Sequence, residues 1–245
     1  MPNKYALLVG ADLYLNDDSR QHTDGKPVSL PTLQGAVNDV EGIQAILRDR
    51  FRFDKPTVLT CSPSPTDPRI PSEPEDNWPT YWRYLLFHFS GHGASLHTTE
   101  LSPQDGRSED PSLMTADYGR GEPAVRGWQL NTWLQDLNSK NVRVIVLLDS
   151  CHSGGAWRTG GRFRSPENWT PPPNLPADEE AAQGTQRKPG HRDGDLEECW
   201  DINPRGFTLM AACQSKQKAA ERDEDGAAYG APGFRPGQTG ISRRL

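Results

Sequence analysis

Two apolar runs in this 245-residue chain each lead into a short polar loop, and this arrangement constrains the fold most strongly. The run at 84–87 precedes His92 in the motif Phe-Ser-Gly-His-Gly, and the run at 142–148 precedes Cys151 in Asp-Ser-Cys-His-Ser-Gly-Gly. Apolar runs of this length, closed by turn residues, are typical of buried strands. An open α/β sheet presents reactive side chains just past the carboxyl ends of its strands, so we expect both residues at that edge.

A histidine and a cysteine in such positions suggest nucleophilic chemistry. A thiol is a weak nucleophile until a base or a positive field converts it to the thiolate. The two loops therefore predict a cysteine hydrolase with His92 as the base and Cys151 as the nucleophile. The alternatives are a buried, unreactive Cys151 and a purely structural His92, since free cysteine is often a core residue.

Strands alternate with helical segments along the chain, which predicts an α/β fold with a parallel sheet and helices on its faces. The expected strands are 5–9, 57–60, 84–90, 142–148 and 207–212, and the expected helices are 36–51 and 128–137.

Both expected helices have an apolar face. The first places Ala36, Val40, Ile43 and Leu47 on one side, and the second places Leu130, Trp133, Leu134 and Leu137 on one side. Asn38 or Asp39 is expected to cap the first helix or to place charge at its positive end.

Three regions lack a periodic apolar pattern. Residues 61–80 contain six prolines where a crossover helix would normally connect parallel strands. Residues 158–204 are rich in proline, glycine and charge, which predicts a disordered linker. Residues 223–245 are glycine-rich and aperiodic, and we expect a loose tail there.

Composition excludes several classes of protein. The formal net charge is −6, and no basic run is long enough to follow a nucleic-acid backbone. The four cysteines are widely spaced, which argues against a disulfide framework or zinc site and suits a reducing compartment. No apolar stretch is long enough to span a membrane, and the amino terminus has no signal-peptide pattern, so we expect a cytoplasmic protein.

The two loops, their order and their spacing resemble the caspase-like clan of cysteine peptidases, and within it metacaspases of the fungal type. Residues 207–212, followed by 217–221, resemble the start of the family's small subunit. The animal caspases carry a different sequence around the nucleophile. The matching segments of the large subunit are 5–10, 33–39, 89–93 and 146–154.

The resemblance implies a caspase-like three-layer sandwich with a mostly parallel central sheet and helices on both faces. It divides the chain into a large-subunit (p20) region at 1–157, the linker at 158–204, a partial small-subunit (p10) region at 205–229 and a loose tail at 230–245. Relatives continue beyond this point with another helix and a final strand.

The resemblance also implies the roles of the catalytic residues. Cys151 attacks the scissile carbonyl, and His92 handles the proton on the leaving amine. The backbone amides of Gly93 and Cys151 are the expected donors to the oxyanion. Metacaspases cleave after Arg or Lys, so the expected partners are protein or peptide substrates with a basic P1 residue, and the family tends to be monomeric.

Three residues match the positions that line the P1 pocket of the family: Asp39, Ser90 and Asp149. Two carboxylates and a hydroxyl suit a guanidinium group, which they bind through charge-assisted hydrogen bonds. A helix-capping role is the alternative for both Asp39 and Asp149. Self-cleavage in the linker is a further hypothesis, because the linker offers five arginines: Arg158, Arg162, Arg164, Arg187 and Arg192.

Calcium is the one cofactor that the resemblance raises, because many metacaspases require it. Where calcium-dependent relatives carry paired acids this chain has Arg126, and where they carry an aspartate after the nucleophile it has Arg158. Scattered acids remain at Asp105, Glu109, Asp110 and Asp117. Calcium needs six to eight oxygen ligands, so we expect no metal site and no cofactor.

A second function remains open from the sequence. The missing crossover helix and the short small-subunit region would suit a catalytically weak caspase-like module that binds or regulates a partner. The loss of the final strand would also expose one edge of the sheet. Hydrolysis of a small substrate with Arg at P1, and its loss in Cys151→Ala, separates the two possibilities.

Overall fold

The computed structural model describes most of the predicted strand and helix segments but not the whole chain. The described residues are 4–16, 25, 28–53, 56–61, 84–102, 106, 108–150, 171–174, 176–185, 206–211, 220–224 and 227–231. Within them, no helix combines the length and the apolar character needed to cross a membrane.

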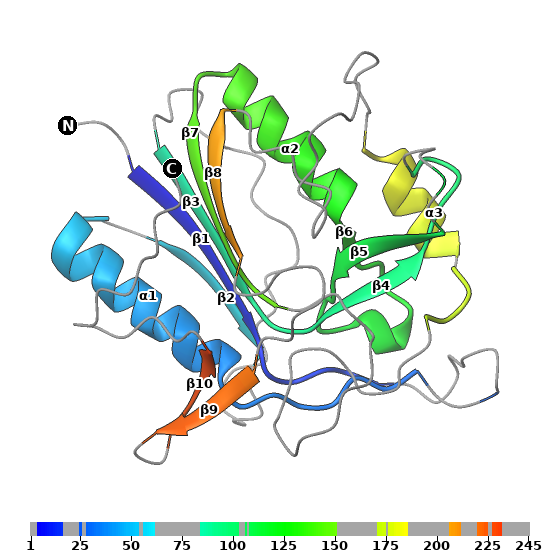
Figure 1. Cartoon of the computed structure of the whole chain (residues 1–245), viewed down its shortest axis with the longest axis horizontal. Helices are drawn as coiled ribbons and strands as arrows, with labels where there is room; N and C mark the ends of the chain where they lie inside the picture. Colours follow the sequence, from blue (N-terminus) through cyan, green and yellow to red (C-terminus); the bar gives the residue numbers. More distant parts are fainter. Residues whose placement is uncertain are drawn as a thin grey trace.

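A five-stranded parallel sheet forms the centre of the molecule (Figure 1). Its strands lie in the order β2-β1-β3-β7-β8, and each neighbouring pair is parallel. The bounds are β1 Lys4–Ala11, β2 Thr57–Cys61, β3 Tyr84–Ser90, β7 Arg143–Asp149 and β8 Phe207–Ala211. The predicted parallel sheet is therefore confirmed, with all five predicted strands in it.

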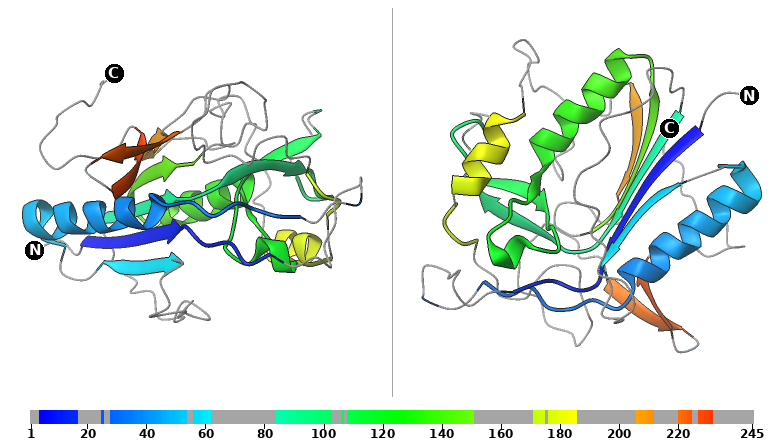
Figure 2. Two further views of the ribbon diagram at one scale, coloured as in Figure 1. Left: turned by 90° about the horizontal axis from the view of Figure 1, so that it is seen from below. Right: turned by 180° about the vertical axis from the view of Figure 1, so that it is seen from behind.

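Helices α1 (Ala36–Phe51) and α2 (Gly127–Ser139) pack on opposite faces of this sheet (Figures 1 and 2). On one face, Leu8 and Leu86 join a buried cluster with α1. On the other face, Val146 and Leu148 join a buried cluster with α2. The alternation of side chains along each strand separates these two cores. The result is the three-layer α/β arrangement that the sequence predicts.

The amino terminus of α1 is capped by a residue that the sequence analysis missed. The Asp12 carboxylate accepts hydrogen bonds from the backbone amides of Ala36 (2.8 Å) and Val37 (3.4 Å). Neither Asn38 nor Asp39 caps the helix, so the capping alternative is wrong, because the Ala36 and Val37 amides are bound by Asp12. The other alternative is confirmed for Asp39, which places an acidic side chain in the first turn of the helix.

Helix α2 buries most of the face expected from the sequence, with the exception of Trp133, and it also buries residues of its first turn. Trp133 is 44% exposed, whereas Trp128 and Gln129 are buried. Leu130 and Leu134 are in the core as predicted, and Leu137 packs against it. The difference arises because the first turn of α2 contacts a second layer of structure beside the sheet, so both sides of that turn are covered.

This second layer is a small antiparallel sheet, here called the side sheet, which the sequence analysis did not predict. Its strands are β4 (Gly93–His97), β5 (Glu109–Leu113) and β6 (Val125–Arg126), in that order. The strands are short and carry polar residues and a proline, so they lack a strand-like apolar pattern. A 3-10 turn, η1 (Tyr118–Arg120), follows β5.

Part of the predicted disordered linker is ordered. Residues 171–174 and helix α3 (Pro176–Gln183) pack beside the side sheet, so the prediction is wrong for these residues. Burial of Ala182 and the hydrogen bonds from Gln129 to Ala181 and Thr185 supply stabilisation that local periodicity did not indicate. Residues 158–170 and 186–204 lie outside the described residues, as does 62–83 with most of the proline-rich segment.

A β-hairpin follows β8. Its strands are β9 (Ala220–Glu224) and β10 (Ala227–Ala231), and β10 lies against α1. Residues 223–245 were expected to form a loose, aperiodic tail, so the hairpin is a second difference from the prediction where its strands extend into that range. The remainder of the expected tail, 232–245, lies outside the described residues.

Candidate active site

The candidate active site lies where β3 and β7 end side by side. Ser90 and Asp149 are register partners at the ends of these strands, and the Gly91 amide donates to the Asp149 carbonyl at 3.3 Å. His92 therefore leaves the sheet beside the point where the chain continues from Asp149 toward Cys151. Cys151 itself lies outside the described residues, so the structure gives no distance between the two side chains.

The His92 ring is fully buried, and its tautomer follows from one contact. Its Nε2 lies 2.8 Å from the carbonyl oxygen of Pro31. A backbone carbonyl only accepts hydrogen bonds, so Nε2 carries the proton. In the neutral ring, Nδ1 is then the nitrogen with the lone pair and the one that can take up a proton.

Tyr14 fixes the position of His92 and was missed by the sequence analysis. Its hydroxyl accepts a hydrogen bond from the His92 amide at 2.7 Å, and the two rings lie 4.8 Å apart at a tilt of 43°. A Cβ at Gly91 would lie 2.8 Å from the Tyr14 hydroxyl, so glycine is required there. No local pattern around Tyr14 indicates this role, because the contact spans 78 residues.

The three candidate pocket residues lie on the face of the sheet covered by α1. The Ser90 hydroxyl donates to the Asp39 carboxylate at 3.1 Å, and both residues are buried. Asp149 is the register partner of Ser90, so its side chain points to the same face. The structure thus joins Asp39 to Ser90 directly and places Asp149 on the adjacent strand.

Gly93, the expected oxyanion donor, is buried and begins β4 directly after His92. Only Gly91 and His92 separate the end of β3 in the central sheet from the start of β4 in the side sheet. The His92 carbonyl accepts from the Met114 amide at 3.0 Å, which ties this junction to the end of β5. The amide of Cys151, the other expected donor, lies outside the described residues.

The described residues do not fit a calcium site. Asp110 is buried against the guanidinium of Arg126, with Oδ2 and Nη1 2.9 Å apart. Glu109 is exposed, and Asp117 is partly buried elsewhere on the chain. No group of three or more His, Cys, Asp or Glu side chains is placed to hold a metal within the part of the chain that the structure describes. A fixed positive charge already neutralises the buried carboxylate.

Cys61 is the cysteine that the structure describes, at the end of β2, and its environment does not activate it. Burial raises the pKa of the Cys61 thiol above its ordinary value, and the charges of Asp117 and Asp12 raise it further. A raised pKa keeps the thiol protonated near neutral pH, and a protonated thiol is a poor nucleophile. Cys61 is therefore a poor candidate for a nucleophile.

Known proteins are similar in sequence to this region. Residues 4–159 match the family model described as Metacaspase, peptidase C14 domain. Metacaspase-1 of Eremothecium gossypii is 26% identical over 186 residues, which cover 68% of this chain and 37% of that protein. Metacaspase-1 of Arabidopsis thaliana is 27% identical over 131 residues, covering 50% of this chain and 35% of that protein.

The fold also has a solved counterpart. The crystal structure of a Geobacter sulfurreducens protein aligns with a TM-score of 0.54 at 21% identity, covering 94% of this chain and 78% of that chain. At this identity the likeness shows the fold alone. The chain spans little more than a third of the length of the curated relatives it matches. Because the family model covers well over half of the residues, the chain belongs to the metacaspase family, with its peptidase C14 domain at 4–159.

Proposed function

We propose that this chain is a cysteine endopeptidase in which Cys151 is the nucleophile and His92 the base. The observation that carries the proposal is the contact between His92 Nε2 and the Pro31 carbonyl, which leaves Nδ1 as the proton acceptor at the end of β3. The neighbouring strand β7 ends at Asp149, two residues before Cys151. Family membership supports the same assignment.

In the proposed reaction His92 acts first as a base, then as an acid and then as a base again. Nδ1 takes the proton of the Cys151 thiol, and the thiolate attacks the carbonyl carbon of the scissile bond. The amides of Gly93 and Cys151 donate to the oxyanion of the tetrahedral intermediate. Nδ1–H then protonates the leaving amine, and water hydrolyses the thioester with His92 again as base. Throughout, Nε2–H donates to Pro31, which stabilises the imidazolium.

We propose that the substrate carries Arg or Lys at P1. Asp39 places a buried carboxylate beside the Ser90 hydroxyl, and Asp149 lies on the adjacent strand at the same height. A cation that reaches a carboxylate forms charge-assisted hydrogen bonds with it, which are stronger than those between neutral groups. A guanidinium can bind two of these groups at once, whereas an ammonium binds as a point charge.

Fluorogenic peptides that differ only at P1 test this proposal. Arg and Lys peptides should be hydrolysed and an Asp peptide should not, and Cys151→Ala should abolish all turnover. Asp39→Asn should raise KM for the Arg peptide at least about tenfold, the equivalent of ~1.4 kcal/mol. Asp49→Asn is the matched control on the same helix, because Asp49 is exposed and pairs with Arg48. Equal hydrolysis of Asp and Arg peptides would exclude the pocket assignment.

A binding module is the second candidate, and one observation favours it. Among the described strands, β8 is an outer strand of the central sheet, and Met210 on β8 and Ile145 on the neighbouring strand β7 are each 38% exposed. Exposed apolar side chains along a sheet edge are typical of an interaction surface. Saturable binding of the Arg peptide to wild type without any turnover would support this function instead of catalysis.

A further inference from the structure

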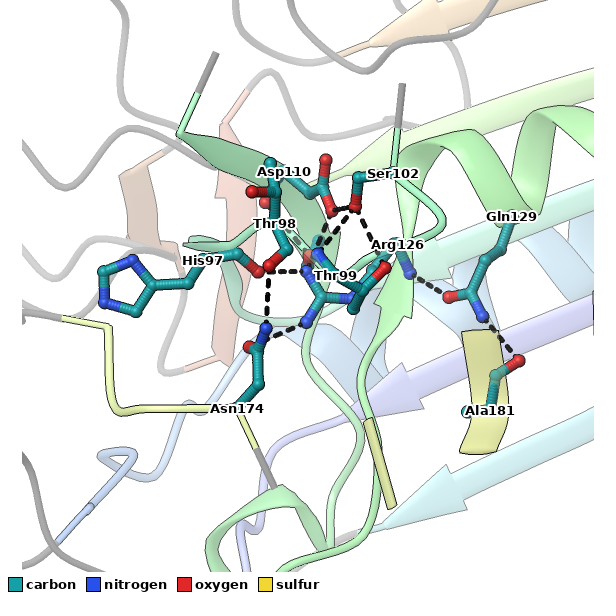
Figure 3. A network of polar contacts seen from close by, with 10 residues as sticks. His97, Thr98, Thr99, Ser102, Asp110, Arg126, Gln129, Asn174 and Ala181 are labelled. Carbon is teal, nitrogen blue, oxygen red and sulfur yellow. Dashed lines mark hydrogen bonds and ion pairs between the residues drawn. The ribbon is translucent and has the colours of Figure 1, made fainter. Parts of the chain in front are cut away.

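Residues 171–174 and 176–185, here called the docked segment, pack beside the side sheet and contact a buried charged network (Figure 3). At its centre is Arg126, whose side chain is almost fully buried. Its Nη1 pairs with the Asp110 carboxylate at 2.9 Å and donates to the His97 carbonyl at 2.7 Å. A buried guanidinium is tolerated only when its N–H groups are paired, so each remaining partner matters for stability.

Asn174 supplies one of these remaining partners from the docked segment. Its Oδ1 accepts from Arg126 Nη2 at 3.0 Å, and its Nδ2 donates to the Thr98 carbonyl at 2.9 Å. One side chain thus bridges the end of β6 and the residue that follows β4 (Figure 3). Loss of this side chain would leave a guanidinium N–H and a carbonyl oxygen without these bonds.

Helix α3 provides a second anchor. The side chain of Gln129, in the first turn of α2, donates to the Ala181 carbonyl at 3.0 Å and to Thr185 Oγ1 at 3.3 Å. Ala182 is fully buried, and Asp178 is nearly so. The docked segment is therefore held at both ends, by Asn174 near its start and by Ala181 and Thr185 near its end.

The distribution of basic residues isolates this segment. No Lys or Arg occurs between Arg164 and Arg187, and the whole docked segment lies within that interval. Basic residues flank it on both sides: Arg158, Arg162 and Arg164 before it, and Arg187, Lys188 and Arg192 after it. Cleavage after basic residues on both sides would excise residues 165–187 without cutting the docked part.

We propose that residues 165–187 remain bound as a noncovalent peptide after the chain is cut on both sides, with Arg126 and Gln129 as its receptor. Where the enzyme makes the cuts itself, this rests on the proposed function. Retention of the peptide preserves the hydrogen bond between Asn174 and Arg126. Arg126 in turn donates to the carbonyl of His97, the last residue of β4. The first residue of β4, Gly93, follows His92 directly. The linker is thus a structural part of the mature molecule on the side sheet.

Limited digestion with trypsin tests retention without relying on the protein's own activity. The full chain carrying Cys151→Ala is digested until denaturing mass spectrometry shows both flanking bonds cut and residues 84–150 intact. Native size-exclusion chromatography then separates bound from free peptide. Residues 165–187 should elute with the large fragment. Elution of this peptide as a free species from the otherwise unaltered chain would overturn the proposal.

Two variants show whether the network is responsible. Asn174→Ala should lower the retained fraction of the peptide at least about tenfold relative to the parent. Gln183→Ala is the matched control, because Gln183 is exposed at the end of α3, and it should retain the peptide. Thermal unfolding of each uncut variant verifies that it is folded. Equal retention in Asn174→Ala and the parent would contradict the assigned receptor. If the peptide is retained but the parent enzyme hydrolyses no substrate, only the proposed catalytic function fails.

Discussion

The orientation of His92 depends on three groups from other parts of the chain. The Pro31 carbonyl binds Nε2, the Tyr14 hydroxyl binds the backbone amide, and the Met114 amide binds the backbone carbonyl. Together they fix the ring and its tautomer. A general base is effective only when its lone pair points at the proton it removes. Pro31, Tyr14 and Met114 take no part in the proposed reaction, but they determine whether the His92 imidazole is oriented to act as a base.

Tyr14→Phe tests this positioning at the residue scale. The change leaves the ring in place but removes the acceptor of the buried His92 amide, which costs about 1–3 kcal/mol of the free energy of unfolding. We expect kcat for the Arg peptide to fall about tenfold with KM little changed, since the substrate pocket is intact. Tyr84→Phe, at the opposite end of β3, is the control and should leave kcat unaltered. A change in KM with kcat unaltered would instead place Tyr14 in the substrate pocket.

Cys61 gives a prediction about pH. In the unfolded chain a thiol ionises near pH ~8.5, whereas burial raises the pKa of Cys61 in the folded protein. The associated stabilisation is complete below pH ~8.5 and is lost as pH rises through the folded pKa. Urea unfolding from pH 7.5 to 10 should therefore show a decline in the free energy of unfolding that is smaller in Cys61→Ser. Identical slopes for the two proteins would refute this.

At the scale of elements, α1 connects the end of β1 to the candidate pocket. Asp12, one residue past β1, caps the helix, and Asp39 in the first turn of the helix binds Ser90 on β3. The close approach at Gly10, where a Cβ would lie 2.9 Å from the Ala36 carbonyl, keeps the helix against the strand. The position of the pocket carboxylate thus depends on how α1 begins.

Asp12→Ala and Asn38→Ala separate the observed cap from the expected one. Loss of the Asp12 carboxylate should reduce the free energy of unfolding by about 1 kcal/mol and raise KM for the Arg peptide, because the first turn of α1 carries Asp39. Asn38→Ala should change stability by less than ~0.5 kcal/mol. Asp12→Asn keeps an acceptor and should recover most of the loss. Chemical denaturation and steady-state kinetics provide both measurements, and a larger effect at Asn38 would restore the original expectation.

The elements differ in how readily the sequence reveals them. The five strands of the central sheet and helix α1 were predicted because their apolar residues follow the period of the element. The strands β4–β6 were not, because their short sequences are mixed and gain stability from pairing and from the buried Arg126–Asp110 contact. Helix α3 was missed for the same reason: its burial depends on residues more than 50 positions away.

In the whole molecule, His92 lies at the junction of two sheets. The central sheet ends at Ser90 and the side sheet begins at Gly93, so the geometry of the base depends on how these two layers meet. Within the side sheet, Arg126 forms a buried cationic centre that pairs with Asp110 and contacts the docked segment. These contacts cross-link the layer beside the candidate active site.

This arrangement predicts independence from calcium. Addition of a chelator or of millimolar calcium should leave hydrolysis of the Arg peptide and the midpoint of thermal unfolding unchanged, because Arg126 already neutralises Asp110. Arg126→Met should lower the midpoint of thermal unfolding markedly, since it leaves a buried carboxylate unpaired, a loss of about 3–5 kcal/mol. A requirement for calcium in the unaltered chain would show that residues outside the described ranges form the metal site.

The sequence by itself determined the parallel sheet, the helix α1 and the two loops that carry His92 and Cys151, because these features follow from local apolar periodicity and from the motifs at the strand ends. It also identified Asp39, Ser90 and Asp149 as a group. The tertiary structure decided the rest: the cap from Asp12, the contacts of Tyr14 and Pro31 with His92, and the docking of residues 171–185. These depend on buried polar groups finding partners far along the chain, and no local pattern encodes which partner a buried hydrogen-bonding group will meet.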